Sequence, residues 1–129
     1  MKVIENYRRA IENSDEDLLE EVFATQVLLE TPAGASDNHS VNEASHIMSQ
    51  VAKTAPGIKC ILTADAGDNW HFLGFEGQIE GQKFQAVDQV HLNKDGKIEQ
   101  LTVYMRPIPA AEKFGEVITQ RLRPATARS

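Results

Sequence analysis

Apolar residues in the first third of the chain recur every three or four positions, which is the spacing of amphipathic helices. This pattern predicts helices over residues 3–11, 18–23 and 44–51. Ser40 and Glu43 stand three residues apart just before the third stretch, a spacing typical of a capped helix start. Each apolar stripe marks the face of its helix that is expected to turn inward.

Elsewhere apolar and polar residues alternate one by one, as they do in half-buried strands. A short strand is expected over residues 26–32, followed by a polar loop over 33–39. Segments that suit hairpin turns separate four further strands, expected over 58–66, 70–79, 83–92 and 97–106. A last helix is expected over 109–122, and near one face it carries Ala111, Phe114, Ile118 and Leu122.

Tight hairpin turns fix which residues of the last strands face one another. A two-residue turn at 80–81 places Leu73 opposite Asp88, and one at 94–95 places Asp88 opposite Leu101. One face of the sheet then collects apolar side chains, namely Leu73, Phe75, Ile79, Phe84, Ala86, Val90, Leu92, Leu101, Val103 and Met105. Asp88 lies in the middle of this row, so its carboxyl group is expected in apolar surroundings.

Composition narrows the class of protein. The chain has 129 residues, a length that suits one domain over residues 1–129 with a disordered tail from about residue 123. Its net charge is −6 at pH 7. Because Lys and Arg are scattered, neither nucleic acid nor an anionic membrane is expected as a partner. No signal peptide or membrane-spanning run is recognisable, which leaves the cytoplasm as the default location. Cys60 is the single cysteine and the histidines lack metal-ligand spacing, so no disulfide, metal or organic cofactor is expected.

Helices, a strand, a helix and a four-strand meander together indicate an α+β fold. Three segments, at residues 7–24, 28–34 and 95–107, resemble the NTF2-like superfamily in its SnoaL-like and ketosteroid-isomerase-like branch. The resemblance covers about residues 3–118. It implies a cone-shaped barrel, in which N-terminal helices cover the concave face of a curved, mostly antiparallel sheet. It does not imply one activity, because this fold hosts isomerases, cyclases, hydrolases, dehydratases and non-catalytic binding modules.

The resemblance also implies roles for individual residues. In ketosteroid isomerases a tyrosine and an aspartic acid hold the substrate oxyanion, and a second aspartate moves the proton. Tyr7 and Asp88 fall at the first two positions, Thr31 falls at the third, and Met105 replaces a cavity-lining tryptophan. A threonine hydroxyl is no general base near neutral pH, so this departure argues against steroid isomerisation. His71, a diagonal neighbour of Asp88 across the expected hairpin, is a candidate replacement base.

Each of these three residues also has a purely structural interpretation. Asp88 is either a buried acid that donates a proton to a ligand oxygen, or a structural acid paired with another buried group. Tyr7 is either a second donor in the pocket or a core residue, and His71 is either a base or a residue of the cavity rim. The expected cavity lining is completed by Leu29, Thr31, Met48, Phe75, Val103 and Met105.

The opposite face of the expected sheet is aromatic and nearly uncharged, which is typical of the core of a protein–protein interface. A homodimer is therefore expected through Trp70, Phe72, Val87, Thr102 and Tyr104. Two functional hypotheses follow. The first is cofactor-independent acid/base chemistry beside a carbonyl or epoxide of a small apolar molecule, as in an isomerase, cyclase or hydrolase. The second is a non-catalytic ligand-binding or dimerisation module.

Overall fold

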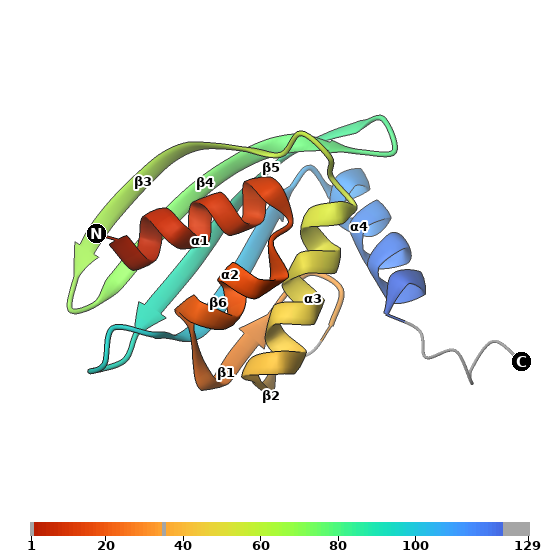
Figure 1. The fold of residues 1–129 in the computed structure, drawn as a ribbon. Helices are drawn as coiled ribbons and strands as arrows, with labels where there is room; N and C mark the ends of the chain where they lie inside the picture. Colours follow the sequence, from red (N-terminus) through yellow and green to blue (C-terminus); the bar gives the residue numbers. More distant parts are fainter. Residues whose placement is uncertain (1, 35, 123–129) are drawn as a thin grey trace, which may run out of the picture.

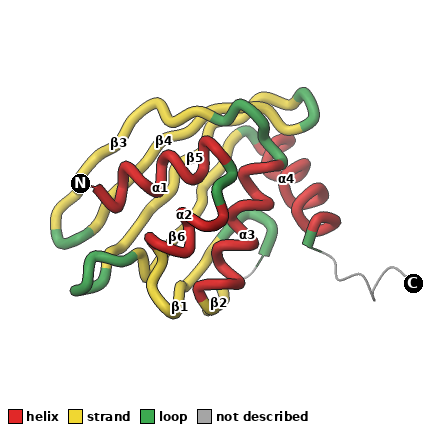
Figure 2. The backbone as a smooth tube through the Cα atoms, in the orientation of Figure 1, coloured by secondary structure: helices red, strands yellow, loops and turns green. Residues whose placement is uncertain are grey.

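The structure is a computed structural model that describes residues 2–34 and 36–122 (Figures 1 and 2). The helices are α1 (Lys2–Asn13), α2 (Glu16–Val22), α3 (Val41–Lys53) and α4 (Ile108–Arg121). The strands are β1 (Phe23–Glu30), β2 (Asp37–Ser40), β3 (Lys59–Gly67), β4 (Trp70–Ile79), β5 (Gln82–Leu92) and β6 (Ile98–Arg106). The tail expected from about residue 123 lies outside the described residues. In the described ranges no helix is long and apolar enough to cross a membrane.

One curved sheet organises the molecule, with strand order β2-β1-β6-β5-β4-β3. The β1–β6 pair is parallel, and the other pairs are antiparallel. Helices α1, α2 and α3 lie together over the concave face of the sheet, while α4 packs at one end against β4, β5 and β6 (Figures 1 and 2). The predicted α+β architecture with N-terminal helices on the concave face is confirmed.

The pairing of β4 with β5 has the predicted register, since Leu73 lies opposite Asp88. The predicted register of β5 with β6 is wrong by two residues, because Asp88 lies opposite Val103. The turn is longer than the two residues expected: the Asn93 amide donates to the Lys97 carbonyl oxygen, and Gly96 has a φ of +77°. A shift by two residues leaves every side chain on its predicted face, so Asp88 still points inward.

Three local features differ from the sequence-based expectation. Phe23 begins β1 and does not extend α2. Part of the segment predicted as a loop is the short strand β2, which pairs with β1. In α4 the buried alanine is Ala110 and not Ala111. The capped start of α3 is confirmed, because the Ser40 side chain accepts from the Glu43 amide and the Glu43 carboxylate accepts from the Ser40 amide.

The hydrophobic core lies between the helices and the concave face of the sheet. Its largest fully buried side chains come from every layer: Tyr7, Phe75, Phe114, Leu19, Met48, Leu73, Ile79, Leu92, Ile98, Leu101, Ile118 and Val27. Asp88 belongs to the same face and is only 4% exposed. The fold therefore places one carboxyl group at the centre of an apolar layer.

Candidate active site

A buried pair of polar side chains, Asp88 and Tyr7, is the centre of the site. Tyr7 lies on the inward stripe of α1, and Asp88 lies on the inward row of β5. The Tyr7 hydroxyl donates a hydrogen bond of 2.6 Å to Oδ2 of Asp88. The Tyr7 ring also packs against Phe23, with ring centroids 6.3 Å apart. The structure thus joins two side chains that are 81 positions apart in the sequence.

Burial changes the acidity of both groups. Removal from water raises the pKa of Asp88 from 3.8 to about 7, although the hydrogen bond from Tyr7 acts in the opposite direction. Burial, together with the neighbouring Asp88 charge, raises the pKa of Tyr7 well above its usual value. Asp88 is consequently present in both its neutral and its ionised form near pH 7. In the neutral form its proton can lie on Oδ1, which leaves Oδ2 to accept from Tyr7.

A small cavity adjoins Asp88, and we call it the inner cavity. Its volume is about 20 Å³, which is room for about one water molecule. The lining includes four residues that the sequence predicted for the pocket, Met48, Phe75, Val103 and Met105. Apart from Asp88 and Thr54, its lining residues are apolar: Ile11, Met48, Val51, Ala55, Ile58, Phe75, Ile79, Phe84, Ala86, Val103, Met105 and Phe114.

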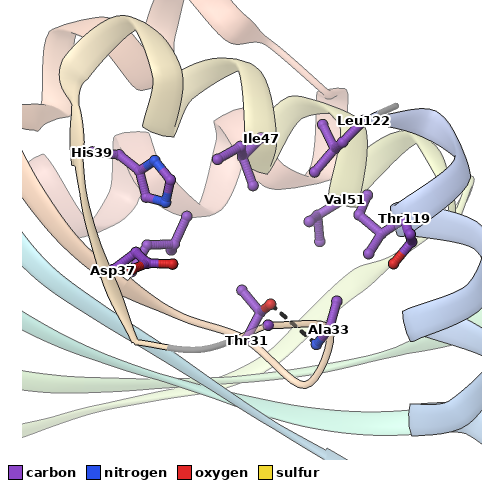
Figure 3. A pocket seen from close by; sticks show the side chains of 11 residues that line it. Thr31, Ala33, Asp37, His39, Ile47, Val51, Thr119 and Leu122 are labelled. Carbon is purple, nitrogen blue, oxygen red and sulfur yellow. Dashed lines mark hydrogen bonds between the residues drawn. The ribbon is translucent and has the colours of Figure 1, made fainter. Parts of the chain in front are cut away.

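A second and much larger cavity, the outer pocket, lies between α3, α4 and the segment that joins β1 to β2 (Figure 3). Its volume is about 480 Å³. Leu29 and Thr31, the other two predicted pocket residues, line this pocket and not the inner cavity. The Thr31 hydroxyl oxygen accepts from the Ala33 amide at 3.2 Å. The residues predicted to line one pocket are therefore divided between these two cavities.

The candidate base stays a diagonal neighbour of Asp88 across the β4–β5 hairpin, as predicted. His71 is buried on β4 opposite Val90, as predicted, but it lines neither cavity. Within residues 2–34 and 36–122, no hydrogen bond joins His71 to Asp88. Glu30, which precedes Thr31, points away from the concave face of the sheet. Its carboxylate accepts from the Thr102 hydroxyl at 2.6 Å, which lowers the pKa of Glu30.

Sequence reasoning missed the contribution of α4. Phe114 lines the inner cavity, and Ile118, one turn later on the same helix, lines the outer pocket. The helical spacing of these two residues did indicate a buried face. It did not indicate that this face would close a cavity in the sheet.

Solved structures of other proteins share this arrangement of helices and strands. Neither a protein-family model nor a curated protein matches the sequence. Solved structures do match: an uncharacterised Silicibacter pomeroyi protein with a cystatin-like fold has a TM-score of 0.89 at 17% identity, over 97% of this chain and 88% of that chain. A steroid delta-isomerase from Pseudomonas aeruginosa has a TM-score of 0.84 at 19% identity, over 94% of this chain and 89% of that chain. An NTF2-like protein of unknown function from Cytophaga hutchinsonii has a TM-score of 0.64 at 17% identity, over 83% and 89%.

This chain has the NTF2-like fold. The predicted cone of a curved sheet under N-terminal helices is thereby confirmed. At these sequence identities the likeness concerns the fold, and the chemistry of this protein depends on its own residues.

The convex face of the NTF2-like sheet exposes several apolar side chains. Tyr104 is 55% exposed and Val87 is 39% exposed, while Trp70, Phe72 and Thr102 are half-buried. Two residues of the edge strand β3, Ile61 and Leu62, extend this apolar surface and were not predicted to do so. The Trp70 ring also lies against His91, with ring centroids 4.4 Å apart.

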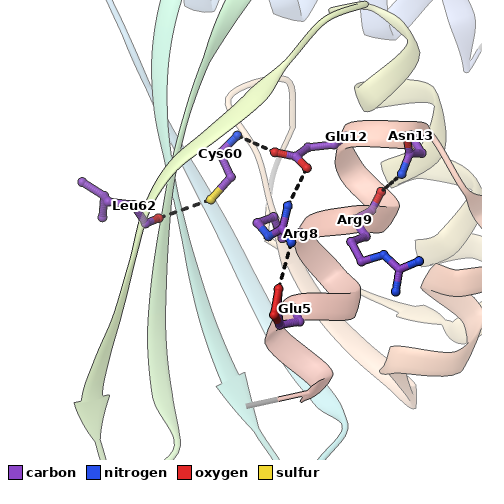
Figure 4. Close-up of polar contacts among 7 residues, drawn as sticks. All are labelled: Glu5, Arg8, Arg9, Glu12, Asn13, Cys60 and Leu62. Atoms are coloured by element: carbon purple, nitrogen blue, oxygen red, sulfur yellow. Dashed lines mark hydrogen bonds and ion pairs between the residues drawn. The ribbon is translucent and has the colours of Figure 1, made fainter.

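A polar network on α1 ties the helix to the edge of the NTF2-like sheet (Figure 4). Arg8 donates to Glu5 and to Glu12, each at 2.8 Å, and Glu12 accepts from the backbone amide of Cys60 at 2.9 Å. Burial raises the pKa of the Cys60 thiol, so little reactive thiolate is present. In the described part of the chain, no group of three or more His, Cys, Asp or Glu residues is placed to hold a metal ion.

Proposed function

We propose that this protein binds a small, largely apolar molecule and performs acid/base chemistry at a carbonyl or epoxide oxygen of that molecule. The observation that carries the proposal is the Tyr7–Asp88 pair, buried in apolar surroundings with a hydrogen bond of 2.6 Å. A carboxyl group with a pKa of about 7 can donate a proton near neutral pH and can take one back.

The two groups take different parts in this chemistry. Neutral Asp88 donates from Oδ1 to the ligand oxygen as negative charge develops there, an effect worth about 10²–10⁴ in rate. Tyr7 has a single hydroxyl hydrogen, and Oδ2 of Asp88 already accepts it. Tyr7 is therefore a positioning residue that orients Asp88, and it leaves Oδ1 directed to the ligand.

A single carboxyl group suffices for reactions that return the proton within one turnover. In the cyclisation of an epoxide, Asp88 protonates the epoxide oxygen as the C–O bond breaks. A hydroxyl of the same substrate forms the new C–O bond and gives its proton to the Asp88 carboxylate. No proton or electron is left over, and no separate base beside Asp88 is needed. An isomerisation beside a carbonyl starts instead from ionised Asp88, which removes a proton from one carbon and delivers the same proton to another, so that no proton is left over.

The second candidate is a non-catalytic ligand-binding module. It is favoured by the small volume of the inner cavity, about 20 Å³, and by the lining of that cavity, to which His71 does not belong. In this alternative the pair recognises a ligand oxygen, and the bound molecule leaves unchanged.

Substitutions at the pair separate these functions. Consumption of a panel of small enones and epoxides is followed by NMR for the wild type, Asp88→Asn, Tyr7→Phe and the control Asp95→Asn, which makes the same change at an exposed turn. Catalysis predicts a loss of turnover of about 10²-fold or more in Asp88→Asn and no change in the control. Binding of a panel member without turnover in any variant supports the binding module. Equal affinity and equal turnover in all four proteins contradict both.

We further propose that the chain forms a homodimer through its convex face. Support comes from the exposed side chains of Val87 and Tyr104 beside Ile61 and Leu62, an apolar area of the kind found in interface cores. A second copy would cover these side chains without touching either cavity.

A further inference from the structure

We infer that the outer pocket holds the apolar body of the ligand, and that the ligand's single oxygen reaches Asp88 through the wall formed by Phe114 and Val51. The inference rests on the proposed function of Asp88 and names the shape and chemistry of the molecule it serves. That molecule is a narrow, apolar one with its oxygen at one end.

The two cavity volumes match the two parts of such a molecule. Small-molecule pockets usually measure about 300–1,000 Å³, and the outer pocket has about 480 Å³. The inner cavity, at about 20 Å³, takes a single water-sized group such as one oxygen function. Neither cavity alone accommodates an apolar molecule whose oxygen hydrogen-bonds Asp88.

The two cavities share part of their lining. Val51 of α3 lines both of them. On α4, Phe114 lines the inner cavity, and Ile118 lines the outer pocket one turn further along. Val51 points into the outer pocket between Ile47 and Thr119 in Figure 3. In the proposed binding mode, a rotation of the Phe114 side chain or a small shift of α4 connects the outer pocket with Asp88.

The polar contacts that hold α4 against its neighbours are weak. Its buried side chains are Ala110, Phe114 and Ile118. Its polar contacts lie at the surface, where Arg121 donates to Gln50 at 3.2 Å and Lys113 lies 3.7 Å from Glu80. Surface pairs of this kind contribute little stability. When the Phe114 ring withdraws, the apolar body of the ligand packs against the same neighbouring side chains in its place.

The outer pocket also has a preference for charge. Leu29, Ile47 and Ile118 give it an apolar wall, whereas Asp37 and His39 lie toward its β2 side (Figure 3). The carboxylate of Asp37 disfavours an anionic group at the far end of the ligand. The expected ligand is therefore neutral or cationic at the end that remains in the outer pocket.

Two probes test the inference: 4-hydroxybiphenyl, an apolar rod with one terminal hydroxyl, and biphenyl, the same rod without oxygen. Their affinities are measured by fluorescence titration. The wild type is expected to bind 4-hydroxybiphenyl about tenfold more tightly, which is the value of one net hydrogen bond. Thr119→Trp fills the outer pocket from an exposed position on α4 and is expected to weaken both probes by about tenfold or more. Gln120→Trp adds the same side chain at the next, exposed position, which does not line the pocket, and is expected to change neither affinity.

The double variant Tyr7→Phe/Asp88→Leu removes both hydrogen-bond partners together, which limits the cost to stability. It is expected to bind both probes equally well, with the affinity for biphenyl unchanged. If Thr119→Trp leaves both affinities unchanged while the double variant loses the preference for the hydroxyl, the ligand uses another route. The inference is then wrong and the proposed role of Asp88 stands. If the double variant keeps the preference, Asp88 does not meet the ligand oxygen, and both the proposed function and this inference are wrong.

Discussion

Replacement of Asp88 by asparagine is expected to remove a specific pH dependence from the stability of the protein. Burial raises the pKa of Asp88 from 3.8 to about 7, so the folded chain holds a proton that the unfolded chain releases above about pH 4. The stability that this proton contributes is fully present below pH 3.8, declines as the pH rises, and is lost above about pH 7. Asparagine stays neutral throughout and can still accept from the Tyr7 hydroxyl.

The size of the effect follows from the difference between the two pKa values. About three pKa units, at about 1.36 kcal/mol each, correspond to about 4 kcal/mol. This is a large part of the unfolding free energy of a typical domain, about 5–15 kcal/mol. The stability of Asp88→Asn relative to the wild type should therefore rise by about 4 kcal/mol between about pH 4 and pH 7 and stay constant above pH 7.

Equilibrium urea unfolding of both proteins at matched protein concentration, from about pH 4 to pH 8, measures this difference. Only the difference is informative, because carboxylates with a lowered pKa, such as Glu5 and Glu30, give the opposite slope in both proteins. Asp95→Asn, at an exposed turn, is the control and should run parallel to the wild type. A constant difference between wild type and Asp88→Asn would show that the Asp88 carboxylate is solvated, which would refute the buried acid and the chemistry proposed for it.

Two further outcomes test the pair and the convex face. Tyr7→Phe removes the hydrogen bond that lowers the pKa of Asp88, so a carbon-13 titration of the Asp88 carboxyl should move upward by about one to two pKa units; an unchanged midpoint argues against the contact. Tyr104→Asp places a charge in the proposed interface and should convert a dimer into a monomer in sedimentation velocity, whereas Gln120→Asp should not. A wild-type monomer at all concentrations contradicts the dimer.

Local rules in the sequence were sufficient for most of the fold. The apolar spacing of α1 places Tyr7 on its inward stripe, and the turn at 80–81 sets Leu73 opposite Asp88. The inward direction of Asp88 was predicted correctly even though the predicted register between β5 and β6 was wrong. Strand side chains alternate with a period of two, so a slip by two residues exchanges neighbours but keeps faces. The face of the sheet on which a strand residue lies is therefore predicted more reliably than the residue that lies opposite it.

Contacts between distant segments were decided by the tertiary structure alone. The sequence places Tyr7 and Asp88 each on an inward face, but only the packing of α1 across β5 brings their oxygens to 2.6 Å. The predicted lining is divided between the inner cavity, beside Phe114 of α4, and the outer pocket, beside Ile118, and this division depends on how distant segments pack. Alternation along a chain specifies which side chains are buried. The space left among them depends on the combined volumes of side chains from several elements, and no single segment of the sequence contains that sum.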